Sequence, residues 1–224
     1  MKQTDKGRSY GIMAFTAACC GAMALVETAI EPPYIVKSAI KAALFLVLPI
    51  IISKAAHIKL FDRSFSLSRK RIAALLALGA LLYGVIIGAY ALTRDLFDYA
   101  SLVQSLSADQ KVDSGSFIWV ALYISFCNSF LEEFLFRLLS FLQLSKYTSK
   151  KIAYAFSSVI FAVYHIAMIG PSFPPLLLLL ALIGLTAGGC LFDYADDKAG
   201  TIYNSWVIHM AADFAIMTIW YRHI

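Results

Sequence analysis

Seven blocks of about 18 to 25 mostly apolar residues limit the fold of this chain more than any other feature. A helix of about 20 residues spans the hydrocarbon core of a bilayer, so each block predicts a transmembrane helix. Charged residues make up only 15% of the chain, against about a quarter in soluble domains. We therefore expect an all-α, polytopic transmembrane bundle that forms one domain over residues 1–224. The predicted spans are 10–30, 35–56, 72–93, 116–143, 151–170, 175–193 and 201–221.

The basic residues of the loops predict the orientation of the bundle. With the N-terminus inside the cell, 13 lysine and arginine residues lie in inner segments and 3 in outer segments. This bias predicts a multi-pass protein of the inner (plasma) membrane with a cytoplasmic N-terminus. It also accounts for the net charge of +5 without a nucleic-acid partner. Much of the bias comes from 60–71, "LFDRSFSLSRKR", which we interpret as a lipid-facing loop.

Two further patterns concern packing. The polar loop 94–115 carries an apolar stripe that predicts a short amphipathic helix on the outer surface. We therefore divide the domain into N-terminal helices with this loop, 1–115, and a catalytic core, 116–224. Two GxxxG patterns, Gly84 to Gly88 and Gly184 to Gly188, predict close contacts between helices.

The fourth span contains three ionisable side chains in the stretch "FLEEFLFRL", 130–138. A charge near the bilayer centre costs about 2.5–3.5 kcal/mol on insertion scales, so these groups require partners inside the protein. Glu133 and Arg137 are four residues apart and share one helical face, which predicts an ion pair. Glu132 points about 100° away and has no basic partner on its own helix. One glutamate therefore looks structural, and the other looks available for chemistry.

Two later spans also place ionisable groups at middle depth. The fifth contains His165, with Phe161 one turn before it. The seventh contains His209 and Asp213 four residues apart, with Asn204 about one turn before His209. A single histidine in an apolar helix is usually a packed core residue. Several such groups on three of four consecutive helices instead favour a shared functional site.

A carboxylate and two imidazoles support two kinds of chemistry. They can hold a water molecule and accept its proton, as general-base catalysis requires. Glu132, His165 and His209 are equally a plausible set of zinc ligands with an open position. Either arrangement yields an activated water that can attack a carbonyl carbon. A serine nucleophile is less favoured, because the serines of these spans lack a nucleophile-elbow context.

Three motifs, in order along these spans, resemble the CPBP family of intramembrane proteases. This family includes the type II CAAX prenyl endopeptidases and the Abi bacteriocin-processing or immunity proteins. The resemblance covers the last four spans, about half of the chain. The matching residues are Glu132-Glu133-x-x-x-Arg137, Phe161-x-x-x-His165 and Asn204-x-x-x-x-His209-x-x-x-Asp213.

The resemblance implies a role for each residue. Glu132 and His165 would activate the attacking water, and Glu133 with Arg137 would form a supporting ion pair. His209 would stabilise the oxyanion. Position 213 departs from the pattern of the CAAX enzymes, which have Asn where this chain has Asp. Asp213 would instead orient His209 and keep it positively charged. Phe161 and Asn204 match supporting positions.

These observations predict an intramembrane endopeptidase of the glutamic type. It would hydrolyse a peptide bond of a membrane-associated protein or peptide, near its C-terminus or a leader or sorting motif, with no cofactor. Zinc bound by the same residues is the mechanistic alternative. The functional alternative is a non-enzymatic bacteriocin-immunity or peptide-binding scaffold. A proton-coupled carrier is a third hypothesis, although the halves show no inverted repeat.

Helix positions also predict the access route. Glu132 and His209 lie about 12–17 Å from the predicted cytoplasmic boundary at 1.5 Å per residue. We therefore expect a water-filled cavity that opens to the cytoplasm and narrows at His165.

Overall fold

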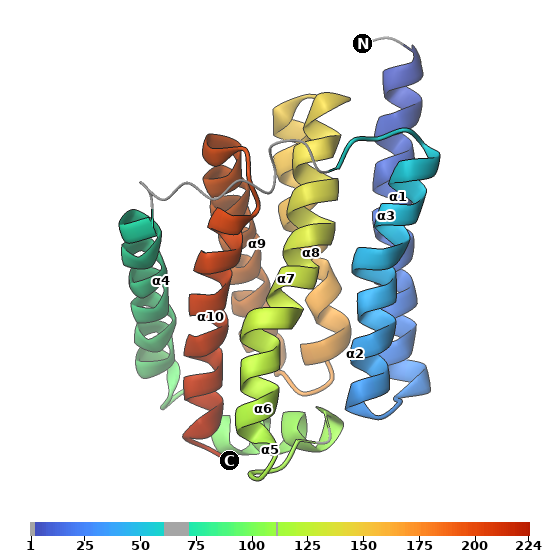
Figure 1. Cartoon of the computed structure of the whole chain (residues 1–224). Helices are drawn as coiled ribbons and strands as arrows, with labels where there is room; N and C mark the ends of the chain where they lie inside the picture. Colours follow the sequence, from blue (N-terminus) through green and yellow to red (C-terminus); the bar gives the residue numbers. More distant parts are fainter. Residues whose placement is uncertain (1–2, 61–71, 111) are drawn as a thin grey trace.

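The computed structural model describes residues 3–60, 72–110 and 112–224. These residues form helices and their connections, with no strand among them (Figure 1). The basic stretch 61–71 lies outside the described residues, as do Lys2 and Lys111. The lipid-facing loop that we predict there therefore stays a prediction.

Six helical segments are long and apolar enough to cross a membrane, which confirms the polytopic helical bundle. Each coincides with one of the first six predicted spans, and the boundaries differ by a few residues. The segments are Asp5–Ile30 (within α1, Gln3–Leu25, and η1, Val26–Ile30), Tyr34–Ala55 (α2, Tyr34–Ala42; η2, Ala43–Val47; α3, Leu48–Ala55), Ile72–Thr93 (α4), Phe117–Lys146 (α6, Phe117–Leu122; η4, Tyr123–Asn128; α7, Ser129–Glu132; η5, Glu133–Gln143; η6, Leu144–Lys146), Lys150–Ile169 (α8) and Pro175–Ala199 (α9).

The seventh predicted span is also helical. It forms α10 (Tyr203–Tyr221), which packs against α4 and α9 and against the fourth segment. It is not among the six apolar segments, because Asn204, His209 and Asp213 lower its hydropathy. It runs antiparallel to α9, and its C-terminal end lies at the end of the bundle that carries α5 (Figure 1).

Successive long segments run in opposite directions through the bundle (Figure 1). One end carries the start of α1, the end of α3, the start of α8 and the end of α9. The other end carries the C-terminus and α5 (Tyr99–Gln110), which lies across the ends of the long helices. The orientation of these ends relative to the cytoplasm stays a prediction.

The amphipathic helix predicted in the loop 94–115 is confirmed as α5. Its Leu102 and Val103 are buried, and Val103 belongs to a small core that also contains Phe117 and Trp220. Trp220 donates its indole N–H to Ser107 Oγ at 3.0 Å, which joins α5 to the end of α10. The apolar stripe therefore packs onto the protein itself.

The prediction from the GxxxG patterns is wrong. No atom of a neighbouring helix lies within 4 Å of a Cβ built on any of their four glycines. Close approach occurs instead at Gly79, where a Cβ would lie 3.1 Å from Ala211 Cβ. It also occurs at Gly189, where a Cβ would lie 2.9 Å from the Ser158 Cα. The two glycines of each motif do lie on one face of their helix, but α4 and α9 turn other faces toward their neighbours.

Among the described residues, the fourth segment contributes more buried residues to the main hydrophobic core than any other segment. All of its residues from 131 to 141 are buried, including four phenylalanine or leucine side chains with no exposed surface between 134 and 138. π-Helical turns occupy η4 and η5, on either side of α7. Such turns often occur near functional sites, and α7 ends at Glu132.

Candidate active site

The four residues predicted as catalytic meet in the middle of the bundle. Glu132 ends α7, His165 lies in α8, and His209 and Asp213 lie in α10. Glu132 Oε2 is 3.8 Å from His165 Nε2 and 3.7 Å from His209 Nε2. Asp213 Oδ1 is 3.7 Å from the same His209 nitrogen. One carboxylate oxygen of Glu132 therefore faces both imidazoles.

Glu132 is not free, because α2 supplies a basic partner that the sequence interpretation missed. Lys41 Nζ donates a hydrogen bond to Glu132 Oε1 at 2.5 Å, and both side chains are buried. Asn128 Nδ2 donates to the same oxygen at 3.0 Å. Lys41 also donates to Asn128 Oδ1 at 2.5 Å, so the three groups form a closed set. A lysine in the middle of an apolar span is the signal that could have identified Lys41.

Hydrogen bonds on the far side of each ring orient the two histidines. His165 Nδ1 lies 2.7 Å from the carbonyl oxygen of Phe161. A carbonyl oxygen only accepts, so Nδ1 carries a proton and Nε2 of the neutral ring has a lone pair facing Glu132. His209 Nδ1 donates to Glu133 Oε1 at 2.7 Å. Both Nε2 atoms are therefore turned toward the Glu132 carboxylate.

The predicted ion pair between Glu133 and Arg137 is present, with Arg137 Nε 3.5 Å from Glu133 Oε2. Arg137 has no exposed surface and lies equally close to a second carboxylate, Asp193 of α9, at 3.6 Å. Ser157 donates to Asp193 at 2.9 Å. The guanidinium carbon lies 4.4 Å from the ring centre of Phe161, a distance typical of a cation–π contact. Sequence interpretation missed Asp193, although it too is an acidic residue in an apolar span.

Asn204 is the one predicted supporting residue that the structure places elsewhere. Its amide donates to the carbonyl oxygen of Ala195 at 3.3 Å, near the turn between α9 and α10. At the same turn, Asp196 accepts hydrogen bonds from the Ser205 backbone N–H at 3.0 Å and from its hydroxyl at 2.7 Å. These contacts hold the start of α10, and through it the position of His209.

The expected cavity toward the end of the bundle that carries Lys146 is not supported. Between Glu132 and that end, the side chains from 131 to 141 are buried. Glu132 and His165 each lie about 20 Å from that end, counted from Lys146 and Lys150 at 1.5 Å per residue. α10 begins inside the bundle, with Ile202 fully buried, so His209 is deeper than its sequence position suggested.

The exposed fractions of the side chains show that the site is covered least on the side away from Lys146. The side chain of Asp213 is 17% exposed and that of His165 is 11% exposed, against 1% for Glu132. His165 is close to the end of α8 that lies near α5. In this conformation the site is closed to bulk water and is least covered toward the α5 end of the bundle.

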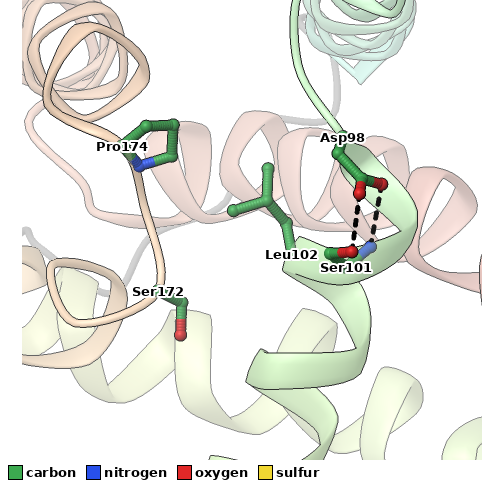
Figure 2. Close-up of a pocket in the computed structure, with 5 residues that line it drawn as sticks. All are labelled: Asp98, Ser101, Leu102, Ser172 and Pro174. Carbon is green, nitrogen blue, oxygen red and sulfur yellow. Dashed lines mark hydrogen bonds between the residues drawn. The ribbon is translucent and has the colours of Figure 1, made fainter.

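A separate surface pocket of about 220 Å³ lies beside α5 and contains none of these residues. Figure 2 shows Asp98 and Ser101 on one side of it, joined by hydrogen bonds, with Ser172 and Pro174 on the other. Its polar side chains already have hydrogen-bond partners: Ser101 is bonded to Asp98, and Ser172 is bonded to Ser105 and Asp109. It is therefore not the candidate site.

The zinc alternative can be tested against the donor groups. Glu132, His165 and His209 are ligand types that zinc prefers. However, the ammonium group of Lys41 already binds Glu132 at 2.5 Å and would repel a dication beside it. Among the described residues, no group of three or more His, Cys, Asp or Glu side chains is placed to hold a metal ion. The arrangement does not fit zinc, and no step below uses it.

Part of the chain is similar to a known protein family. Residues 114–215 match the family model described as "Type II CAAX prenyl endopeptidase Rce1-like". No curated protein and no solved structure matches the chain. The matched region includes every candidate residue from Glu132 to Asp213, and Lys41 lies outside it. This part of the chain is therefore similar to the type II CAAX prenyl endopeptidases, the family that the three sequence motifs resemble.

Proposed function

We propose that this protein is an intramembrane endopeptidase in which Glu132 activates a water molecule for peptide-bond hydrolysis. The family match supports protease activity of the CAAX type. The observation that carries the mechanism is the position of Glu132 Oε2, which faces the Nε2 atoms of His165 and His209 at 3.8 and 3.7 Å. These distances exceed that of a direct hydrogen bond, and a water molecule that contacts all three groups suits such spacing.

The proposed reaction needs only groups of this chain. A water molecule donates one hydrogen bond to Glu132 Oε2 and another to the lone pair of His165 Nε2. Its oxygen forms a bond with the carbonyl carbon of the scissile peptide, while Glu132 accepts a proton from it. The C–N bond then breaks, and the proton passes from Glu132 to the leaving nitrogen. The products are a new carboxyl terminus and a new amine.

His209 is suited to the charge that develops on the carbonyl oxygen. Its Nδ1 is committed to Glu133, so a proton on Nε2 can donate to the oxyanion. Asp213 lies 3.7 Å from that nitrogen and favours the protonated ring. This role suits an aspartate at position 213, because an ionised carboxylate cannot itself donate to an oxyanion.

The substrate that we propose is a membrane-associated protein or peptide, cleaved near its C-terminus or at a leader or sorting motif. Burial of Glu132 among apolar helices supports a substrate that reaches the site from within or beside the bilayer.

The basic loops support a plasma-membrane location with a cytoplasmic N-terminus. Single cysteines at Lys150 and Ser101 should then react with an impermeant thiol reagent only from the cytoplasm and only from outside, respectively. Reaction at both positions from one side would reject this topology.

A direct assay can test the proposed reaction. The protein is purified, placed in liposomes and given a farnesylated, internally quenched CAAX peptide. Membrane proteins from cells with and without it are compared in parallel for new termini by mass spectrometry. We expect Glu132→Gln and His165→Ala to abolish cleavage in both assays. Glu27→Gln is the matched control, since Glu27 is also a buried glutamate in an ion pair, with Lys37 at 2.6 Å.

The same assay separates the alternatives. Cleavage should persist in the presence of a strong chelator, because no proposed step uses a metal. Loss of cleavage with chelator and recovery with zinc would establish the metalloprotease alternative. Cleavage by Glu132→Gln at the wild-type rate would reject Glu132 as the base. An immunity phenotype that survives Glu132→Gln would favour the non-enzymatic scaffold.

A further inference from the structure

We infer that Lys41 is a positioning residue of the active site, which holds one oxygen of Glu132 so that the other is the reacting base. This inference rests on the proposed role of Glu132. It concerns a residue of α2 that lies outside the family match at 114–215. The N-terminal half of the chain would thus complete the site as well as support it.

The two oxygens of Glu132 have different surroundings. Oε1 accepts from Lys41 Nζ at 2.5 Å and from Asn128 Nδ2 at 3.0 Å. Oε2 instead faces the two imidazoles, at 3.8 Å from His165 Nε2 and 3.7 Å from His209 Nε2. A carboxylate with one oxygen held by two donors cannot rotate freely about its last side-chain torsion. Oε2 is therefore kept in the direction from which water is activated.

Lys41 is itself fixed in place. Its side chain is 7% exposed, and its ammonium nitrogen lies 5.0 and 5.4 Å from the ring centres of Tyr164 and Phe45. These distances are typical of cation–π contacts, which hold the ammonium group without competing for Glu132. Besides its bond to Glu132, Lys41 Nζ donates a second hydrogen bond, to Asn128 Oδ1, at 2.5 Å. The clamp formed by Lys41 and Asn128 is rigid because each member binds the other as well as Glu132.

Charge is the second contribution of Lys41. Glu132 lies next to Glu133 in the chain. Glu132, Glu133 and Asp213 all lie close to His209, so three carboxylates are buried near one another. Burying several carboxylates together is unfavourable unless cations lie beside them. Arg137 serves Glu133 and Asp193, so Lys41 is the lysine or arginine that the described residues place against Glu132. It keeps a buried carboxylate in the ionised form that a base requires.

α2 also contains a natural control for this inference. Lys37 lies one turn before Lys41, is similarly buried, and forms its own ion pair with Glu27 at 2.6 Å. It also donates to Gln110 of α5 at 3.2 Å, and neither of these two partners belongs to the candidate site. Loss of Lys37 removes a buried cation from the same helix without releasing Glu132.

The test compares kcat and KM of Lys41→Met, Lys41→Arg and Lys37→Met on the farnesylated CAAX peptide. We expect Lys41→Met to lower kcat about 100-fold, the scale of a misplaced catalytic group, with little change in KM. Lys41→Arg should recover part of the loss because it keeps the cation. Lys37→Met should retain the wild-type kcat. Wild-type kcat in Lys41→Met, or equal losses in both methionine variants, would overturn the inference.

A second variant and a second measurement keep the test decisive. If Lys41→Met does not fold, Asn128→Leu removes the other donor to Oε1 and should lower kcat about tenfold, the scale of one hydrogen bond. Thermal unfolding of Lys41→Met, Glu132→Gln and the double variant measures the coupling between the two residues without any substrate. Absence of coupling would reject the clamp. Cleavage by Glu132→Gln would instead reject the proposed function, so the two failures are distinguishable.

Discussion

His209 Nδ1–H donates a hydrogen bond to Glu133 Oε1 at 2.7 Å, although the two residues are 76 positions apart in the sequence. The carboxylate that accepts this hydrogen bond is also the ion-pair partner of Arg137. Glu133 therefore links the structural ion pair to the proposed oxyanion-binding imidazole. The second glutamate of the pair fixes which nitrogen of His209 is free to face the substrate.

Glu133→Gln should lower kcat by about 10- to 100-fold, the usual cost of losing a partner that orients a catalytic histidine. The amide oxygen of glutamine can still accept from His209, but the amide group then turns its N–H atoms toward Arg137. KM should change little, because Glu133 is buried behind His209. Steady-state kinetics in liposomes would measure both constants. A wild-type kcat would contradict the orienting role.

Arg137→Met should destabilise the fold by about 3–5 kcal/mol, the cost of breaking a buried ion pair. The substitution leaves the carboxylates of Glu133 and Asp193 buried without the cation that now lies 3.5 and 3.6 Å from them. Lys150→Met is the matched control. Lys150 pairs with Asp197 at 2.5 Å, but its side chain is 63% exposed, and such pairs contribute about 0–1 kcal/mol. Unfolding in detergent would measure the loss of stability in each variant. Equal losses in Arg137→Met and Lys150→Met would contradict the prediction.

Features that depend on one helix could be predicted from the sequence. The first six spans could be predicted from the lengths of the apolar blocks, because the thickness of the bilayer determines how many residues a membrane-spanning helix needs. The pairing of Glu133 with Arg137 followed from the helical repeat alone. The meeting of Glu132, His165 and His209 could be inferred because buried ionisable groups in a membrane protein need one another.

Features that depend on how two helices are rotated and shifted could not be predicted in this way. Lys41 was visible in the sequence, but its distance to Glu132 depends on the packing of α2 against the fourth segment. The same reason explains why a Gly189 contact was missed and the GxxxG contacts were predicted wrongly. The depth of His209 was underestimated because α10 begins inside the bundle, which residue counting along a single helix cannot show.

Gly189→Ala should destabilise the packing of α8 against α9. The new Cβ would lie 2.9 Å from the Cα of Ser158, a backbone atom that can move only with its helix. Overpacking of this kind costs about 1–3 kcal/mol. The neighbouring Gly188→Ala is the control, since its Cβ would meet no atom within 4 Å. That substitution should stabilise the helix by up to about 1 kcal/mol, and thermal unfolding of both variants would show opposite shifts.

The docking of α5 should weaken in acid through Asp98. Its carboxylate accepts hydrogen bonds from the Ser101 hydroxyl at 2.6 Å and from the Ser101 backbone N–H at 3.1 Å, at the start of the helix (Figure 2). These hydrogen bonds lower the pKa of Asp98 below its ordinary value of 3.8. The bond from the Ser101 hydroxyl has the larger effect, and the bond from its backbone N–H has the smaller one. A lowered pKa means that the folded state favours the ionised form. The stabilisation is therefore complete above pH 3.8 and is lost as the pH falls through the lower value.

Hydrogen exchange of the α5 amides across this pH range would measure the effect. Intrinsic exchange rates also change with pH, so the comparison is made with Asp98→Asn at each pH. Asparagine keeps an acceptor for the start of the helix but does not titrate. We expect the protection of α5 in the wild type to fall toward that of Asp98→Asn in acid and to exceed it at neutral pH. Identical profiles at all pH values would show that the Asp98 charge does not hold α5 in place.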